Sequence, residues 1–204
     1  AAKLTRLLIS KKLEPYSFWG SPFNFQMKEK FTSLNEPSSI STVFSGLALI
    51  DFFVQTKSSE SLDLIIKIRE DIFKHFLKDE TKPYFLYSTR RRNVIINSNA
   101  LILRFLYKSH QCSPLPKTKL HIMEIILQEI ILKNRNSKGF WPYNLDPKPR
   151  FDFDYHQGFI IESLIDIFKI VENEKLFKNI VMEEYKNIMI ESLNFYWTNQ
   201  FNTN

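Results

Sequence analysis

Apolar and charged segments alternate along the chain. Three segments are apolar over most of their length, as helices buried on most sides are: residues 40–54, 99–107 and 159–171. Each is followed by a more charged segment: residues 61–77, 117–132 and 175–197. The pattern predicts three pairs, each made of a buried inner helix and an outer helix with one face in water.

The first charged segment shows the helical period most clearly. Its apolar residues recur at steps of three and four, while charged residues fill the positions between them. The apolar stripe consists of Leu62, Ile65, Ile68, Ile72 and Phe76. This segment is therefore expected to be an outer helix.

A long loop with polar and aromatic residues precedes each apolar segment. The loops are residues 20–39, 87–99 and 139–157. The unit of loop, inner helix and outer helix repeats at roughly 57 residues, slightly longer than most repeat architectures. Stacked hairpins of this kind build an α/α toroid or a solenoid, and a closed toroid takes about six of them. The sequence predicts an all-α, incomplete α/α toroid of about three hairpins, forming one domain over residues 1–204 or a piece of a longer toroid.

Composition agrees with a helical protein and excludes several classes of site. Glycine is scarce, with 4 residues against 19 phenylalanines, which disfavours a fold rich in strands and turns. Cys112 is the single cysteine, so a disulfide framework and a multi-cysteine metal site are excluded, and a cytoplasmic location is expected. The sequence has no glycine-rich phosphate loop, no G-x-S-x-G and no H-E-x-x-H, so we expect neither a cofactor nor a metal.

The positive charge and the apolar segments raise two further alternatives. The net charge of +6 comes from dispersed lysines apart from one run, Arg90 to Arg92, so a solvated basic surface is favoured over nucleic-acid binding. Residues 40–54 are interrupted by polar side chains and are too short for a membrane span. Exposed edges of an incomplete toroid would favour a homo-oligomer or docking of a missing toroid segment.

The three loops must emerge on one rim of such a toroid, because each leads into an inner helix. Rigid scaffolds present functional residues on loops in this way. We expect the rim to bind a carbohydrate, with candidate binding residues Trp19, Gln26, Arg90, Arg91, Asn97, Asn99, Trp141, Tyr143, Arg150, Asp154 and Tyr155.

The start of the third inner helix holds the candidate catalytic residues. Asp154 and Gln157 have the spacing of a capping box, which would leave Asp152 without a capping role. His156 is either a packing residue of the first turn or a proton carrier paired with Asp152. Glu162 enters an otherwise hydrophobic helix, where a buried carboxylate must be paired or have a raised pKa. The candidate catalytic residues are His156, Asp152 and Glu162.

Two other pairs of rim residues have two interpretations each. Trp141 and Tyr143 would stack on a sugar face or plug the end of the toroid. Asn97 and Asn99 would cap the second inner helix or offer amide hydrogen bonds to hydroxyl groups.

Several motifs resemble a family of bacterial α/α-toroid proteins associated with polysaccharide biosynthesis loci. They are "FWGSPFNFQ" (18–26), "PSSISTVFSGLALIDFF" (37–53), "NVIINSNALILRFLYK" (93–108) and "GFWPYNLDPKPRFDFDYHQGFIIESL" (139–164). The chain is also distantly similar to the C-terminal helical domain of D-glucuronyl C5-epimerases. The resemblance implies polysaccharide biosynthesis or modification.

Two functions follow as expectations. The first is an epimerase, lyase or hydrolase that acts on an anionic, uronic-acid-type glycan, with Arg90, Arg91 or Arg150 binding the carboxylate. The second is a non-catalytic glycan-binding or scaffold protein of polysaccharide assembly, which keeps the aromatic rim but needs no proton transfer.

Overall fold

A computed structural model describes residues 2–27, 30–79, 81–90, 93–145, 155–176 and 182–200. The helices are α1 (Ala2–Ser10), α2 (Ser39–Thr56), α3 (Ser59–His75), α4 (Ile96–Cys112), α5 (Lys117–Ile126), α6 (Tyr155–Glu174) and α7 (Met182–Gln200). A π-helical turn (Leu127–Ile131) and a 3-10 turn (Leu132–Asn134) continue α5. The all-α prediction is confirmed, and each predicted inner segment lies inside α2, α4 or α6.

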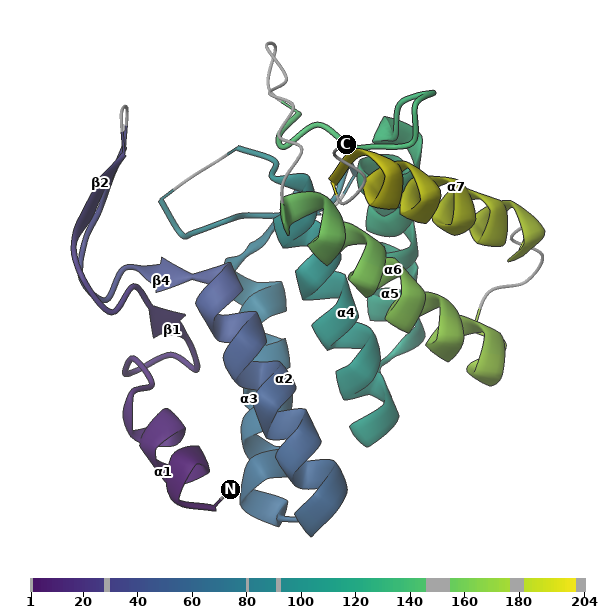
Figure 1. The fold of residues 1–204 in the computed structure, drawn as a ribbon. Helices are drawn as coiled ribbons and strands as arrows, with labels where there is room; N and C mark the ends of the chain where they lie inside the picture. Colours follow the sequence, from purple (N-terminus) through teal and green to yellow (C-terminus); the bar gives the residue numbers. More distant parts are fainter. Residues whose placement is uncertain are drawn as a thin grey trace.

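The helices form an arc of hairpins in the part of the chain that the structure describes. The inner helix α4 lies between α2 and α6 and packs against both (Figure 1). The outer helix α3 packs against α2 and α4, the π turn that extends α5 packs against α4, and α7 packs against α6. This is the predicted arrangement of about three inner and outer helix pairs, with neighbours in sequence also neighbours in space.

Two serines begin the first hairpin. The Oγ atom of Ser38 accepts the N–H of Ser41 (3.4 Å) at the start of α2, and that of Ser58 accepts the N–H of Ser61 (3.3 Å) at the start of α3. Such caps satisfy N–H groups that the first helical turn leaves unpaired. Between the two helices, Lys57 takes the left-handed conformation (φ 56°) and its N–H bonds to the carbonyl of Phe53, which ends α2.

Short strands lie in the connecting loops and were missed at the sequence level. β1 (Trp19–Gly20) pairs with β4 (Pro37–Ser38), β2 (Phe25–Met27) with β3 (Lys30–Thr32), and β5 (Leu77–Lys78) with β6 (Tyr84–Phe85), all antiparallel. Strands of two or three residues are too short to show an alternating pattern. The β2–β3 hairpin projects from the body beside α2 (Figure 1).

The core centres on α4, which is buried along almost its whole length. Gly46 of α2 lies against Phe105 of α4, and a Cβ atom added at Gly46 would lie 2.5 Å from Cε2 of that fully buried ring. The absence of a side chain at Gly46 therefore allows α2 and α4 to approach closely.

Replacement of Gly46 by alanine is expected to lower the free energy of unfolding by about 1–3 kcal/mol, because overpacking strains a close-packed core. Chemical denaturation measures the change. Gly158→Ala is the matched control, since its added Cβ would lie 3.1 Å from the hydroxyl of Tyr196, a much milder overlap than the 2.5 Å at Phe105. An equal cost at the two glycines would contradict this account of the α2–α4 contact.

The helix α2 is also the one helix in the described ranges that is long and apolar enough to cross a membrane by length and composition alone. It contacts α1, α3 and α4, and Val43 and Leu49 are fully buried. These contacts place α2 in the core, but the helix is less buried than predicted, because Phe44 and Val54 are exposed.

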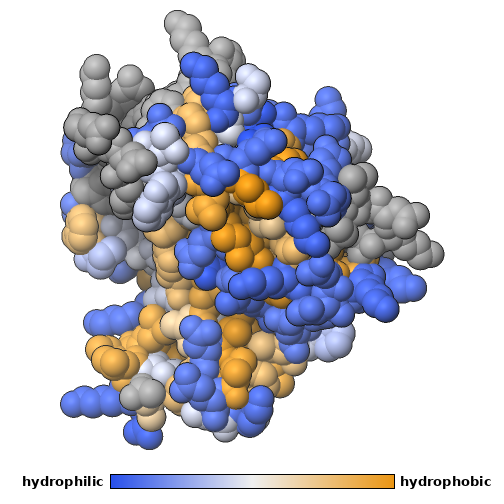
Figure 2. All heavy atoms as spheres, turned by 45° about the vertical axis from the view of Figure 1, so that its right-hand side comes forward, coloured by the Kyte–Doolittle hydropathy of each residue, from blue (hydrophilic) through white to orange (hydrophobic). Residues whose placement is uncertain are grey.

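Large apolar side chains are exposed at the two ends of the arc. On the side where α6 and α7 lie, hydrophobic residues are interspersed with hydrophilic ones (Figure 2). The exposed apolar residues of the terminal helices are Leu4 and Leu7 on α1, and Ile190, Leu193 and Trp197 on α7. An arc of hairpins leaves its first and last members without a neighbour on one side, which accounts for this exposure.

Candidate functional site

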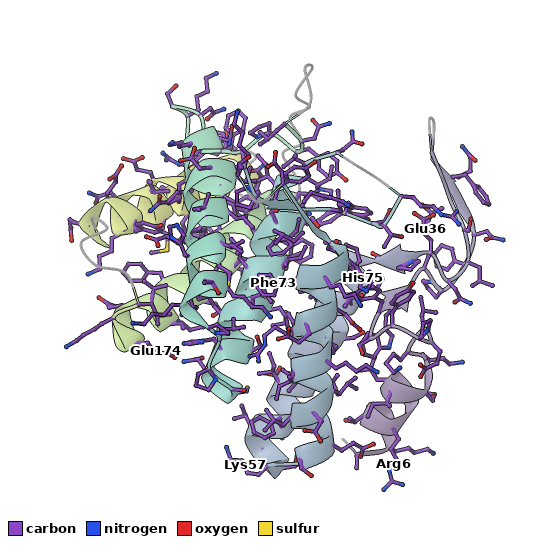
Figure 3. The ribbon with its side chains drawn as sticks, turned by 180° about the vertical axis from the view of Figure 1, so that it is seen from behind. Arg6, Glu36, Lys57, Phe73, His75 and Glu174 are labelled. Carbon is purple, nitrogen blue, oxygen red and sulfur yellow. The ribbon has the colours of Figure 1, made fainter. Side chains whose placement is uncertain are left out.

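The inner helices all begin at one end of the arc, which we call the loop rim (Figure 1). The hydroxyl groups of Ser39 (α2) and Ser98 (α4) share a hydrogen bond of 2.9 Å, and the N–H of Ile96 donates to the carbonyl of Tyr143 (3.1 Å) in the loop that leads to α6. Figure 3 shows Glu36 near this end and Lys57 at the other end of α2. The predicted convergence of the loops is therefore observed.

An aromatic cluster surrounds His156 on this rim. The half-buried His156 ring stacks on Tyr155 (centroids 4.2 Å apart, planes at 28°) and meets the edge of Tyr143 (5.0 Å, 81°). Tyr155 is 61% exposed, so the cluster presents an aromatic surface to the solvent. Farther along the inner face, Phe159 of α6 packs edge-on against Phe44 of α2 (5.7 Å).

Asn97 adds a buried acceptor to the rim. It is the second residue of α4 and is 5% exposed, yet its Oδ1 accepts no hydrogen bond within the described structure. An unpaired buried acceptor costs about 1–3 kcal/mol, and a donor supplied by a ligand would offset this cost. Arg104 and Lys108 lie two and three turns farther along the same face of α4.

Charged residues of α4 and α6 pair below the aromatic cluster. Arg104 donates from Nε to Asp166 Oδ2 (2.7 Å) and from Nη2 to Glu162 Oε1 (2.8 Å), and Lys108 lies 3.1 Å from the same Asp166 oxygen. Burial opposes ionisation of Asp166, but the hydrogen bond from Lys108 and the charge of Arg104 outweigh it and lower its pKa. Glu162 was expected to be buried; instead its side chain is 55% exposed and paired.

Three predicted binding residues are part of the core. Trp19 donates from Nε1 to the carbonyl of Leu8 (2.9 Å), and the fully buried Trp141 donates to the carbonyl of Ile131 (2.7 Å). Asn99 is also fully buried, and its amide bonds to backbone groups (the N–H and carbonyl of Phe85 and the carbonyl of Ile95). In this structure Trp19, Asn99 and Trp141 hold segments together, and Trp141 matches the plug interpretation.

The other predicted site residues are dispersed over the surface or lie outside the described residues. Gln26 is exposed on the projecting hairpin, and Arg90 is exposed in the loop before α4. Arg91, Arg150, Asp152 and Asp154 lie outside the described residues, so the predicted pairing of Asp152 with His156 stays a prediction. No group of three or more potential metal ligands occurs among the residues that the structure describes.

Gln157 has a role that the sequence pattern did not reveal. Its side chain accepts the N–H of Trp141 (3.0 Å) and donates to the carbonyl of the same residue (2.7 Å). It therefore fixes the third loop to α6. The predicted capping box of Asp154 and Gln157 stays a prediction, because Asp154 lies outside the described residues. A buried glutamine opposite a loop backbone leaves no local sequence pattern.

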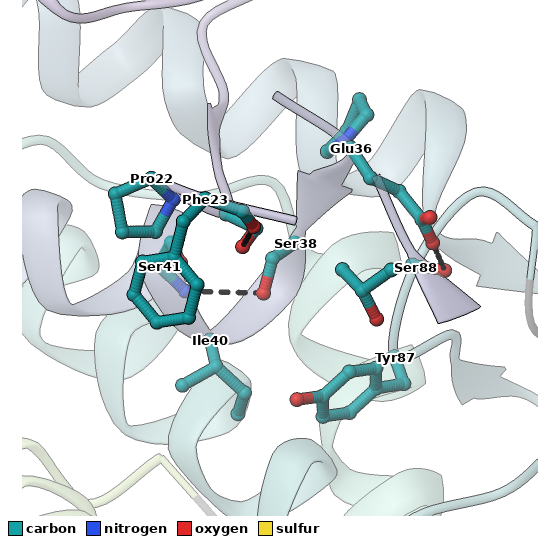
Figure 4. Close-up of a pocket in the computed structure, with 11 residues that line it drawn as sticks. Pro22, Phe23, Glu36, Ser38, Ile40, Ser41, Tyr87 and Ser88 are labelled. Carbon is teal, nitrogen blue, oxygen red and sulfur yellow. Dashed lines mark hydrogen bonds between the residues drawn. The ribbon is translucent and has the colours of Figure 1, made fainter. Parts of the chain in front are cut away.

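The loop rim also contains a cavity of about 170 Å³ that was not predicted from the sequence (Figure 4). It lies between β4, the start of α2 and the loop after β6. Its polar lining includes Glu36, Ser38, Ser41 and Ser88, and Phe23 and Tyr87 are among its aromatic and apolar residues. The residues are far apart in sequence, which is why no motif identified them.

Comparison with known proteins shows the fold. No family model and no curated protein matches the chain. Three solved structures resemble 94–95% of this chain at 8–11% identity: cellobiose 2-epimerase from Spirochaeta thermophila (TM-score 0.68), a sugar epimerase from a ruminal bacterium (0.68) and unsaturated glucuronyl hydrolase from a Bacillus species (0.66). They are α/α toroids, as predicted for this chain.

The matched region is only part of those proteins. The chain covers 50% of the cellobiose 2-epimerase, 53% of the sugar epimerase and 53% of the glucuronyl hydrolase. The chain thus spans about half the length of the solved structures it resembles, in agreement with an incomplete toroid.

Proposed function

We propose that the loop rim binds a carbohydrate and that the chain belongs to an enzyme acting on an anionic, uronic-acid-type glycan in polysaccharide biosynthesis or modification. The observation that carries the proposal is the unpaired, buried Oδ1 of Asn97 on the same rim as the aromatic cluster of His156. The solved structures of similar fold support it, because their names describe two sugar epimerases and a glucuronyl hydrolase.

Each rim residue has a chemical role in this proposal. Tyr155 offers its exposed ring to a sugar face, and Asn97 accepts a hydrogen bond from a sugar hydroxyl. Arg90, which is exposed on the rim, binds the carboxylate, a role that Arg91 and Arg150 can share. His156 transfers a proton, with Asp152 as its acidic partner and with Glu162 farther along α6.

The ion pair of Glu162 favours a second candidate, a non-catalytic glycan-binding protein. The carboxylate of Glu162 lies 2.8 Å from Nη2 of Arg104, so this oxygen is engaged in an ion pair within the protein instead of facing a substrate. Turnover of a uronic-acid oligosaccharide with a bell-shaped pH profile would favour the enzyme; binding without turnover would favour this alternative.

We expect glucuronate or galacturonate to raise the melting temperature of the protein, because a ligand of the folded state stabilises it by mass action. At a concentration about 100 times Kd the gain is about 2.7 kcal/mol, or roughly 5–10 °C for a chain of this size. Both Asn97→Ala and His156→Ala should remain folded and lose most of this shift.

A remote substitution controls for general effects on stability. Lys133→Ala changes an exposed side chain whose ion pair with Glu129 lies beyond α5, so the shift should persist. A full shift in both rim variants would refute the proposed site. The absence of a shift with every uronate in the unmodified protein would refute the proposed ligand class.

A further inference from the structure

The rim cavity beside α2 has a chemical character different from that of the His156 cluster. Its volume of about 170 Å³ is below the ~300 Å³ of typical drug-sized pockets, so it has room for one small ring rather than an oligosaccharide. In Figure 4, Phe23 and Tyr87 lie on different sides of the cavity and Glu36 lies on a third.

Glu36 is a buried carboxylate with unused acceptor capacity. It is 7% exposed, and its oxygens accept a hydrogen bond from the Ser88 hydroxyl (3.0 Å) and a long one from the N–H of Ser33 (3.5 Å). A carboxylate has about four lone-pair sites, so these two hydrogen bonds leave sites for further donors. No lysine, arginine or histidine of the described residues forms an ion pair with it.

The nature of the ligand follows from these groups. A negative wall in a partly enclosed cavity repels an anion and favours donors such as hydroxyl groups. Serine hydroxyls at Ser38, Ser41 and Ser88 both donate and accept, as the hydroxyl groups of a sugar do. The ring of Phe23, which is 62% exposed, offers an apolar surface for the C–H face of a pyranose.

We propose that this cavity is a subsite for one neutral sugar ring, with Glu36 accepting hydrogen bonds from its hydroxyl groups and Phe23 packing against its apolar face. The inference rests on the proposed function and deepens it, because it implies a substrate in which a neutral sugar accompanies the uronate. Ile40 lines the cavity, and one turn farther along α2 the ring of Phe44 contacts Phe159 of α6. This wall connects the cavity to the His156 cluster.

NMR titration of the labelled protein with the neutral methyl pyranosides of glucose, galactose and mannose tests the proposal. At least one should shift the resonances of residues around the cavity, and the matching methyl glucuronide should not shift them. Glu36→Gln keeps the shape and an acceptor for Ser88 but removes the charge, and should weaken binding at least tenfold. Glu172→Gln, on an exposed part of α6, is the charge control.

A second pair of variants tests the cavity without altering Glu36, so that an effect of Glu36→Gln on folding cannot decide the result. Phe23→Ala changes an exposed side chain in the cavity wall and should also weaken binding at least tenfold, whereas Phe31→Ala, a 57% exposed residue on the β2–β3 hairpin, should not. The subsite is overturned if no neutral glycoside binds, or if binding survives both Glu36→Gln and Phe23→Ala. Uronate binding at His156, measured in parallel, reports separately on the proposed function.

Discussion

Asn99→Ala is expected to lower the free energy of unfolding by about 3 kcal/mol, because it removes an amide that bonds to both the N–H and the carbonyl of Phe85. Both groups lie in the core, where an unpaired polar group costs about 1–3 kcal/mol. The substitution also releases the loop after β6 from the start of α4. Urea denaturation measures the loss.

The matched control is two residues away on the same helix. Asn97 is also a buried asparagine, but its Oδ1 has no partner in the described structure, so Asn97→Ala should change stability by less than about 1 kcal/mol. The pair of variants separates an asparagine that stabilises the fold from one whose unpaired oxygen lowers stability. Similar losses at the two positions would contradict the distinction on which the proposed site depends.

Trp141→Ala is expected to cost about 4 kcal/mol, the usual range for truncating a fully buried aromatic residue being 3–5 kcal/mol. The side chain fills the core beneath the rim, and its Nε1 donates to the carbonyl of Ile131 (2.7 Å). Trp141→Phe keeps most of the apolar volume and loses the donor, so a smaller cost of about 1–2 kcal/mol is expected. Thermal and urea unfolding of the two variants give these values.

Ligand binding by Trp141→Phe separates the two interpretations of this residue. Because Trp141 is fully buried, the variant should show the same uronate-induced thermal shift as the unmodified protein. A normal stability combined with a lost shift would instead indicate that Trp141 stacks on the sugar and is exposed when the ligand binds.

The helices were predictable from the sequence because their apolar periods are long and regular. Residues 61–77 show the period directly, and the observed α3 spans Ser59–His75. The strands were not predictable, since each covers only two or three residues, which is too short for an alternating pattern. Their positions are set by the tertiary packing of the loops.

The rim was predictable, but the roles of its residues were not. Asn97 and Asn99 have the same residue type and lie in the same first turn of α4, yet the helical rotation turns one toward Phe85 and leaves the other without a partner for its oxygen. Trp141 is an aromatic residue of the kind that can stack on a sugar, but it is fully buried in the core. Glu36 belongs to no motif, and its contact with Ser88 appears only in the folded chain.

The central claim, that a uronate binds beside His156, is tested most directly by NMR of the histidine side chains. The chain has four histidines, and the three others, His75, His110 and His121, are internal controls. His75, the last residue of the outer helix α3, packs against Tyr16 and Phe18. His110 accepts a hydrogen bond from the N–H of Leu115 (2.8 Å). Titration with glucuronate or galacturonate should shift the imidazole resonances of His156 alone. A saturable shift at another histidine, or none at His156, would contradict the claim.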